Sequence, residues 1–382
     1  MSPKRIIGLD LLRAIAVLAV VLSHTAGFLS PVTRLPYIGK PLDTLIWLSQ
    51  PLGALGVELF FVLSGFLIGG ILVKAYTGPG RFDGGQLRYF LMRRWFRTLP
   101  NYWLILTVNI LLYHLVLAAD FDAYKFSYYP FLQNLWHPHP PYFFGEAWSL
   151  SVEEWFYLSL PFCLYLTDAW VRPVHKKRSL LLVLLGYMLV FIVLRCFNAA
   201  DPVYGPDQDS NIRKIVIFRL DALGYGVIWS YVYHVRKELL QRIKGILFWL
   251  GIAAIGFLYY LLRVRNIADA ADPAARYWSN ALLYLVLPLA FSLLLPYASS
   301  LRQLGSARLE QLISWIARIS YSIYLVHYSL VFIPFFSFLK IEDPAQAAGL
   351  YAAYWMIVLV LSYLLYRYFE LPAMNLRDRF VR

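Results

Sequence analysis

The sequence predicts an all-α fold: a polytopic membrane helical bundle of about ten transmembrane helices with both termini in the cytoplasm. The chain of 382 residues is 60% hydrophobic and only 15% charged, and its mean hydropathy is +0.58. Soluble domains are about one quarter charged, so this composition excludes an ordinary soluble protein. The 12 Trp and 29 Tyr residues suit the aromatic belts at the two bilayer surfaces. The lipid bilayer is therefore the first partner that we expect.

Ten apolar segments are long enough to cross the hydrocarbon core of a bilayer as helices. More than twice as many Lys and Arg residues lie in the connecting loops assigned to the inside as in those assigned to the outside. Under the positive-inside rule, this asymmetry places both termini on the cytoplasmic side of the cytoplasmic (inner) membrane. The expected spans are residues 8–29, 52–74, 98–119, 147–170, 179–197, 213–235, 245–263, 279–297, 312–338 and 348–368.

Charge and cysteine content exclude several other classes of protein. Positive-inside loops explain the net charge of +13, so no nucleic acid partner is expected. The two cysteines, Cys163 and Cys196, both lie in apolar runs, so the sequence has neither a disulfide framework nor a CxxC metal motif. No metal site is expected. Residues 1–382 are expected to form a single membrane domain, with no appended soluble hydrolase-like domain.

The first expected span carries three ionisable residues, Asp10, Arg13 and His24. At about 100° per residue, the eleven steps from Arg13 to His24 end only about 20° from a whole number of turns. Asp10 lies about 40° to the other side of His24, so one narrow stripe holds all three. Arg13 and His24 are roughly 16 Å apart along the axis. Ionisable groups inside a membrane are costly and usually functional. The structural alternative is a snorkelling Arg13 and Asp10 with a buried His24.

The second and third spans also carry charged residues. Glu58 lies a few residues inside the second span. Arg93, Arg94 and Arg97 precede the third span, and Arg94 and Arg97 share one helical face because they are three residues apart. Guanidinium groups bind phosphates through paired hydrogen bonds, so this cluster is a candidate site for a phosphorylated cytoplasmic donor. Ordinary positive-inside charge is the alternative.

Three later spans contain further candidates. Glu153 and Glu154 are adjacent and point about 100° apart on a helix, so at most one of them faces a shared cavity. In the sixth span, Arg219 and Asp221 either neutralise each other within the bundle or belong to a site. His327, near the middle of the ninth span, is either a second functional histidine or a packing residue.

The charged residues separate by depth in the membrane. Three arginines, Arg13, Arg94 and Arg97, lie towards the cytoplasm. Such a layout suits the transfer of a group from an inside donor to an outside acceptor, and it suits an ion-coupled transporter as well, since transporters also carry acid and histidine relays. The residues in the outer half are His24, Glu58, Glu153, Glu154, Arg219 and Asp221.

Five short motifs follow one another along nearly the whole chain. They are GLDLLRAIA with the ten-residue spacing between Arg13 and His24, GVELFFVLSGFLI, RRWFRTLP, WSLSVEEWFY and YSIYLVH. In this order they resemble the acyltransferase-3 family of integral membrane O-acyltransferases, of the envelope glycan acetyltransferase type. One difference is Glu58, because the family often has Asp at the corresponding position.

The resemblance implies a reaction and its substrates. The expected reaction moves an acyl group, usually acetyl, from acetyl-CoA or another acyl-CoA to a hydroxyl of an extracytoplasmic or lipid-linked glycan. No metal is implied, and any two-stage relay would need a separate periplasmic protein. The alternative in another class is a proton-coupled transporter or flippase of a lipid or glycan, with Asp10, His24 and Glu58 as its proton relay.

The resemblance also leads to expected roles for individual residues. The three arginines at cytoplasmic depth would bind the phosphates of the acyl-CoA. His24 would act as general base on the acceptor hydroxyl, oriented by Glu153 by preference and by Glu58 next. Alternatively, His24 is itself acylated and hands the group on. Asp10 is expected to pair with Arg13 or a neighbouring cation. Candidates for binding substrate or stabilising the oxyanion are Glu154, Arg219, Asp221, Tyr321 and His327.

Overall fold

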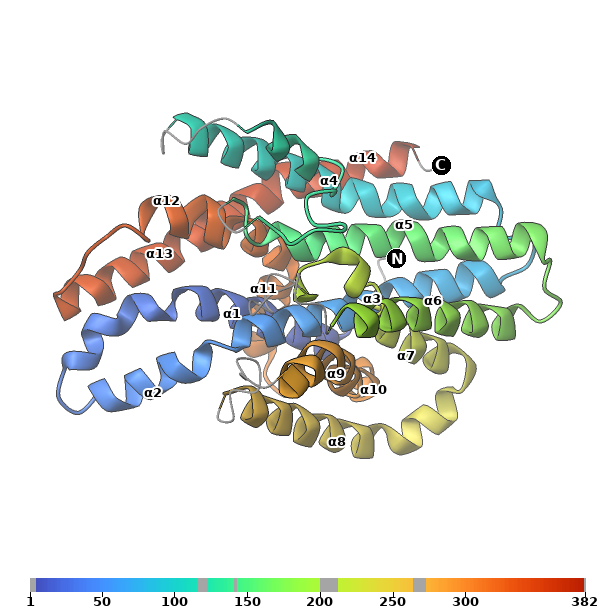
Figure 1. The fold of residues 1–382 in the computed structure, drawn as a ribbon, viewed down its shortest axis with the longest axis horizontal. Helices are drawn as coiled ribbons and strands as arrows, with labels where there is room; N and C mark the ends of the chain where they lie inside the picture. The colour runs from blue at the N-terminus through green and yellow to red at the C-terminus, as the bar shows by residue number, and fades with distance from the viewer. Residues whose placement is uncertain (1–4, 116–121, 141–142, 200–211, 264–272, 381–382) are drawn as a thin grey trace.

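A computed structural model describes residues 5–115, 122–140, 143–199, 212–263 and 273–380. Within these ranges every regular element is a helix, which confirms the all-α fold (Figure 1). Short 3-10 or π-helical turns, labelled η, connect or extend the α-helices. The elements are α1 (Ile7–Thr25), η1 (Ala26–Arg34), α2 (Gly39–Ser49), α3 (Leu52–Thr77), α4 (Gly84–Leu115), η2 (Ala123–Tyr128), α5 (Ala147–Trp170), α6 (Lys176–Asn198), η5 (Val216–Phe218), α7 (Gly224–Val235), α8 (Lys237–Arg263), α9 (Pro273–Ser292), α10 (Leu295–Ser300), α11 (Ala307–Val326), η7 (His327–Phe332), α12 (Ile333–Phe335), α13 (Pro344–Leu365), η8 (Tyr366–Glu370) and α14 (Leu371–Phe380).

Seven helical segments in the described residues are long and apolar enough to cross a membrane, so the chain is a multi-pass membrane protein. They correspond to seven of the ten expected spans. The expected spans over α4, α5 and α7 are not among them. The count of ten and the cytoplasmic position of both termini stay predictions. The seven segments are residues 7–34, 52–77, 176–198, 237–263, 281–300, 307–335 and 344–377.

The expected span over residues 213–235 differs most from the prediction. Helix α7 begins only at Gly224, and its 12 residues cover about 18 Å, which is less than the roughly 30 Å of a hydrocarbon core. The chain before it forms the short turn η5, followed by the buried residues Arg219 and Asp221. This irregular backbone lets both charged side chains reach partners on α3 and α6, described below.

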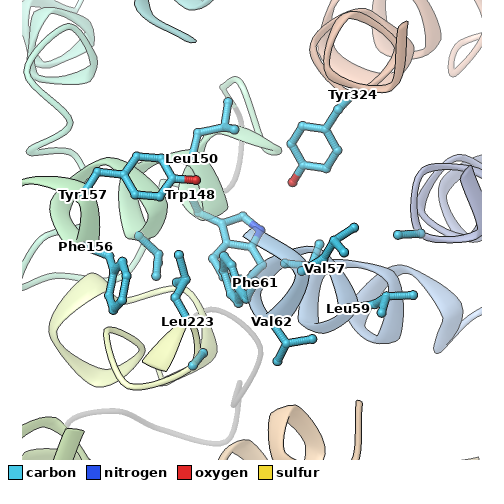
Figure 2. Packing of buried hydrophobic residues seen from close by; sticks show 14 of the residues in the cluster. Val57, Leu59, Phe61, Val62, Trp148, Leu150, Phe156, Tyr157, Leu223 and Tyr324 are labelled. Carbon is cyan, nitrogen blue, oxygen red and sulfur yellow. The ribbon is translucent and has the colours of Figure 1, made fainter. Parts of the chain in front are cut away.

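Helices α1, α3, α7 and α11 pack together at the centre of the bundle (Figure 1). Phe61 and Val62 of α3 are fully buried, and Figure 2 shows them beside Trp148 of α5 and Leu223. Phe61 meets Trp148 edge to face, with ring centroids 5.9 Å apart, a favoured aromatic geometry. Segments far apart in sequence therefore meet in one core, with α1 against α11 and α14 against α4.

Helices α3 and α7 approach each other closely because both have glycine at the contact. A Cβ atom at Gly65 would overlap the carbonyl oxygen of Leu223, and one at Gly226 would overlap the carbonyl oxygen of Val62. Small residues at such crossings are the usual way for membrane helices to pack, because lipid leaves van der Waals contact as a main attraction between them. The α3–α7 pair therefore depends on these glycines.

We expect Gly226→Ala to lower the free energy of unfolding by about 1–3 kcal/mol, the usual cost of overpacking a filled interior. The matched control is Gly256→Ala on the outer face of α8, where an added Cβ meets nothing within 4 Å. Thermal unfolding of the detergent-solubilised protein measures both variants. Equal melting temperatures for Gly226→Ala and the wild type would contradict the close packing of α3 and α7.

Candidate active site

A cavity lies between α1, α3, α4, α5 and α11, with about 770 Å³ of empty space when the part open to solvent is included. Arg13 reaches it from α1, and Arg94 and Arg97 reach it from α4. The three arginines predicted as donor ligands therefore line one cavity. Its other polar lining residues are Ser64, Thr98, Ser149, Glu153, Tyr157, Ser320, Tyr321 and Tyr324.

The cavity is strongly cationic. Arg13 is repelled electrostatically by Arg97 and Arg94 and is attracted by Asp10. The guanidinium of Arg94 lies over the ring of Tyr157, 5.2 Å from its centroid, and its buried Nε has no hydrogen-bond partner among the described residues. An unpaired buried donor is costly, so this nitrogen is suited to an anionic ligand. Within the described residues, no cluster of His, Cys, Asp and Glu could hold a metal ion.

Arg93 belongs to the same sequence cluster but not to the cavity lining. Its Nη1 donates to the hydroxyl of Tyr89, 2.8 Å away, and its guanidinium lies 5.5 Å from the centroid of that ring. The helical face shared by Arg94 and Arg97 thus points inward, as their spacing predicts, while Arg93 lies on a different face.

Glu153 and Glu154 face different cavities, as their 100° separation predicts. Glu153 lines the arginine cavity, where it accepts hydrogen bonds from the hydroxyls of Tyr157 at 2.6 Å and Ser64 at 3.3 Å. Glu154 lines a second cavity of about 540 Å³, and its buried Oε2 has no hydrogen-bond partner among the described residues. The rings around this second cavity belong to Trp95, Trp103, Tyr129, Phe131 and Trp155.

His24, at the last turn of α1, is paired with His327. Nδ1 of His24 and Nε2 of His327 are 2.9 Å apart, with ring centroids 5.2 Å apart and ring planes only 8° from parallel. His24 is half-buried and His327 is fully buried. The sequence interpretation gave His24 a carboxylate partner, Glu153 or Glu58. In the structure an imidazole occupies that position instead.

Glu58, Arg219 and Asp221 belong to two fully buried ion pairs. Glu58 of α3 pairs with Arg219, and Asp221 accepts two hydrogen bonds from Arg195 of α6 at 2.7 and 2.9 Å. The option that Arg219 and Asp221 neutralise each other is therefore wrong, because each binds a charge on a neighbouring helix. None of the four lines the arginine cavity. Together they fasten the segment before α7 to the bundle.

Two other candidates have ordinary hydrogen-bonded positions. Tyr321 lines the arginine cavity, but its hydroxyl donates to the carbonyl oxygen of Thr98 at 2.9 Å. Asp10 forms an ion pair with Arg5 at 3.5 Å and accepts a hydrogen bond from Ser314 at 3.2 Å. Asp10 is thus paired with a neighbouring cation, one of the two partners expected from the sequence.

Three buried charged residues, Arg195, Glu146 and Glu370, are not among the candidates from the sequence. Glu370 accepts hydrogen bonds from Ser322 at 2.8 Å and Asn101 at 3.1 Å, and it attracts Arg97 and Arg13 electrostatically. The only sequence signal was a carboxylate next to an apolar run, which also fits a solvated helix end.

Glu146 joins the start of α5 to the turn that carries His327. Its carboxylate accepts hydrogen bonds from the backbone N–H and the hydroxyl of Ser329, at 3.2 and 2.5 Å. Its backbone carbonyl accepts one from the hydroxyl of Tyr324 at 3.2 Å. Tyr324 also lines the arginine cavity, so Tyr324 and Glu146 together connect the cavity wall to the turn that carries His327.

The fold and the site together define a polytopic membrane protein with a cationic cavity inside its helical bundle. The chain belongs to the acyltransferase-3 family, whose model, described as an acyltransferase domain, matches residues 6–367. This match confirms the resemblance found in the sequence motifs and supports acyltransferase activity.

Curated relatives carry names of the same kind. The O-acetyltransferase OatA of Staphylococcus aureus (strain NCTC 8325 / PS 47) is 24% identical over 97% of this chain and 57% of its own length. A putative O-acetyltransferase of strain MRSA252 is 24% identical over 98% of this chain and 59% of its own length. The chain thus spans a little over half the length of these relatives. No solved structure matches it.

Removing one charge of a buried pair strands the other, which typically costs about 3–5 kcal/mol. We therefore expect Arg219→Met to destabilise the protein by about this amount, and the double variant Arg219→Met with Glu58→Met to recover much of the loss. Thermal unfolding measures the stability of the single and double variants. An O-acyl transfer assay of the double variant then tells the two roles of Glu58 apart: activity is retained if Glu58 is structural and lost if Glu58 is catalytic. A stable double variant without activity would restore Glu58 to the catalytic residues.

Proposed function

We propose that this protein is an O-acyltransferase of the cytoplasmic membrane. It moves an acyl group, acetyl by preference, from a cytoplasmic acyl-CoA to a hydroxyl of an extracytoplasmic or lipid-linked glycan, or to a separate relay protein. The observation that carries the proposal is that α1 holds both Arg13, which lines the cationic cavity, and His24, which is paired with His327. Membership of an acyltransferase family supports it.

The arginine cavity fits the phosphates of the donor. Coenzyme A carries a diphosphate and a further phosphate, and guanidinium groups bind such groups through paired, charge-assisted hydrogen bonds. Arg13, Arg94 and Arg97 reach one cavity from two helices, and the buried Nε of Arg94 has no hydrogen-bond partner among the described residues. The donor phosphates supply the missing negative charge.

His24 fits the role of general base. Along α1 it lies roughly 16 Å from Arg13, a length that the pantetheine arm between the phosphates and the thioester can bridge. An imidazole is the side chain best suited to proton transfer near neutral pH. Its Nε2 lies beside Gly53 of α3, where an added Cβ would be 4.0 Å away.

A transporter or flippase of a lipid or glycan is the rival function. The two differ in a direct assay: the acyltransferase releases free CoA from radiolabelled acetyl-CoA and transfers the label, whereas a transporter does neither. Family membership favours the acyltransferase. Two of the three residues in the expected proton relay also have charged partners, because Glu58 pairs with Arg219 and Asp10 with Arg5.

Replacing His24 tests the base. We expect His24→Ala to lower kcat for acyl transfer by more than about 100-fold, the usual contribution of a general base. The control is His234→Ala, which removes an exposed histidine whose Nδ1 hydrogen-bonds to the carbonyl of Ser230 at 2.8 Å. Near-normal transfer by a well-folded His24→Ala protein would rule out the base. A trapped acyl group on His24 would instead identify it as the nucleophile.

Replacing the arginines tests the donor site. We expect Arg94→Ala with Arg97→Ala to raise the KM for acetyl-CoA by about tenfold or more, because each charge-assisted hydrogen bond contributes about 1.5–3 kcal/mol. Arg93→Ala removes a cation from the same cluster that does not line the cavity, so its KM should stay close to the wild-type value. Steady-state kinetics in nanodiscs measure both. If the two variants raise the KM equally, the cluster acts through its net charge and not through the cavity.

A further inference from the structure

His327 holds His24 through a chain of hydrogen bonds that ends at a backbone carbonyl. Nδ1 of His327 lies 2.8 Å from the carbonyl oxygen of Tyr324, and Nε2 of His327 lies 2.9 Å from Nδ1 of His24. Both ring nitrogens of His327 are therefore in use. The ring is fully buried, and burying a charged group costs far more than burying a neutral one. We therefore take it as neutral.

The position of each proton follows from these partners. A carbonyl oxygen can only accept a hydrogen bond, so Nδ1 of His327 must carry the proton. In a neutral ring the other nitrogen, Nε2, then has a lone pair and must accept. Nδ1 of His24 must therefore donate, which places its proton on Nδ1. The lone pair of His24 is left on Nε2, the nitrogen beside Gly53 of α3.

We propose that His327 is a positioning residue that fixes the tautomer of His24, so that the unprotonated Nε2 of His24 is presented to the acceptor hydroxyl. This inference rests on the proposed function. In other enzymes a carboxylate commonly orients the base in this way. Here a second imidazole does so, and the carbonyl of Tyr324 ends the chain.

The reaction step balances with these two residues. Nε2 of His24 takes the proton of the acceptor hydroxyl as the hydroxyl oxygen attacks the thioester carbonyl carbon. The C–S bond then breaks, and the departing thiolate takes the proton back from Nε2, so an ester and a free thiol are formed. Between these events His24 is an imidazolium, and its Nδ1–H bond to the lone pair of His327 stabilises the charge.

The local backbone holds His327 in register for this role. Helix α11 ends at Val326, and the π-helical turn η7 begins at His327. Such turns are rare in proteins, and those that occur are often found at functional sites. The hydroxyl of Tyr354 on α13 donates to the carbonyl oxygen of His327 at 3.1 Å. Tyr328, the next residue, packs its ring against His24 with centroids 4.5 Å apart. Neighbouring residues therefore hold both the backbone of His327 and the ring of His24 in place.

Two substitutions at position 327 separate positioning from packing. His327→Phe keeps an aromatic ring of similar shape but offers no acceptor to His24. In His327→Gln the side-chain oxygen can accept the Nδ1–H of His24, since the end of a glutamine side chain reaches about as far as Nε2 of histidine. We expect kcat to fall about 10- to 100-fold in His327→Phe, the usual effect of losing an orienting partner, and to be largely retained in His327→Gln.

Nitrogen NMR of the full-length, histidine-labelled protein in nanodiscs reads the tautomer directly. Protonated and unprotonated ring nitrogens have well-separated shifts, and comparison with His24→Gln assigns the His24 signals. We expect a protonated Nδ1 and an unprotonated Nε2 in the wild type and in His327→Gln, and a mixture of tautomers in His327→Phe. A proton on Nε2 of His24 in the wild type would overturn the proposal.

The kinetic and spectroscopic measurements test the positioning role of His327 and the proposed function independently. Equal kcat values for His327→Phe and His327→Gln, with both folded, would show that His327 only packs. If His327→Phe does not fold, the wild-type spectrum and the activity of His327→Gln still decide the question. A wild-type spectrum with the proton on Nδ1, in a protein that never releases CoA, would leave the hydrogen-bond chain standing and refute the proposed function.

Discussion

The bundle depends on pairing charges that no solvent reaches. Glu58 with Arg219 and Arg195 with Asp221 are completely buried, and the two pairs join the segment before α7 to α3 and to α6. An isolated charge in such an interior is prohibitively costly, so the short segment before α7 has to stay against α3 and α6. With this segment in place, α7 crosses α3 at the two glycines, and α3 provides a fixed wall for the cavity and a neighbour for His24.

The arginine cavity follows a different electrostatic rule from the core. Three cations share it with few carboxylates, of which Glu153 lines the wall and Glu370 acts from the C-terminal part of the chain. The proposed donor phosphates offset this excess of positive charge. The same protein thus balances its charges in the buried ion pairs beside α7 and has an excess of cations in the cavity.

Sequence periodicity predicted the parts of this structure that depend on one helix alone. The all-α class follows from apolar segments long enough to cross a bilayer as helices. The shared face of Arg94 and Arg97 and the divergence of Glu153 from Glu154 follow from 3.6 residues per turn. Partners on other helices could not be predicted, because they depend on packing: Arg219 and Glu58 are 161 residues apart, and His24 and His327 are 303. The interrupted helix before α7 was missed for the same reason, since its cause is a tertiary ion pair.

The charged residues in and near the arginine cavity are far apart in the sequence, so they are synthesised and inserted at different times. Arg13 enters the membrane with the first helix, Arg94 and Arg97 follow with α4, and Glu370 arrives with η8, almost at the end of the described chain. Until then the nascent bundle holds three neighbouring cations without the carboxylate of Glu370. Asn101 and Ser322 also lack the oxygen to which they donate hydrogen bonds in the complete protein. The negative charge of Glu370 beside the cavity is therefore added late in synthesis, and a chain interrupted before η8 would lack it.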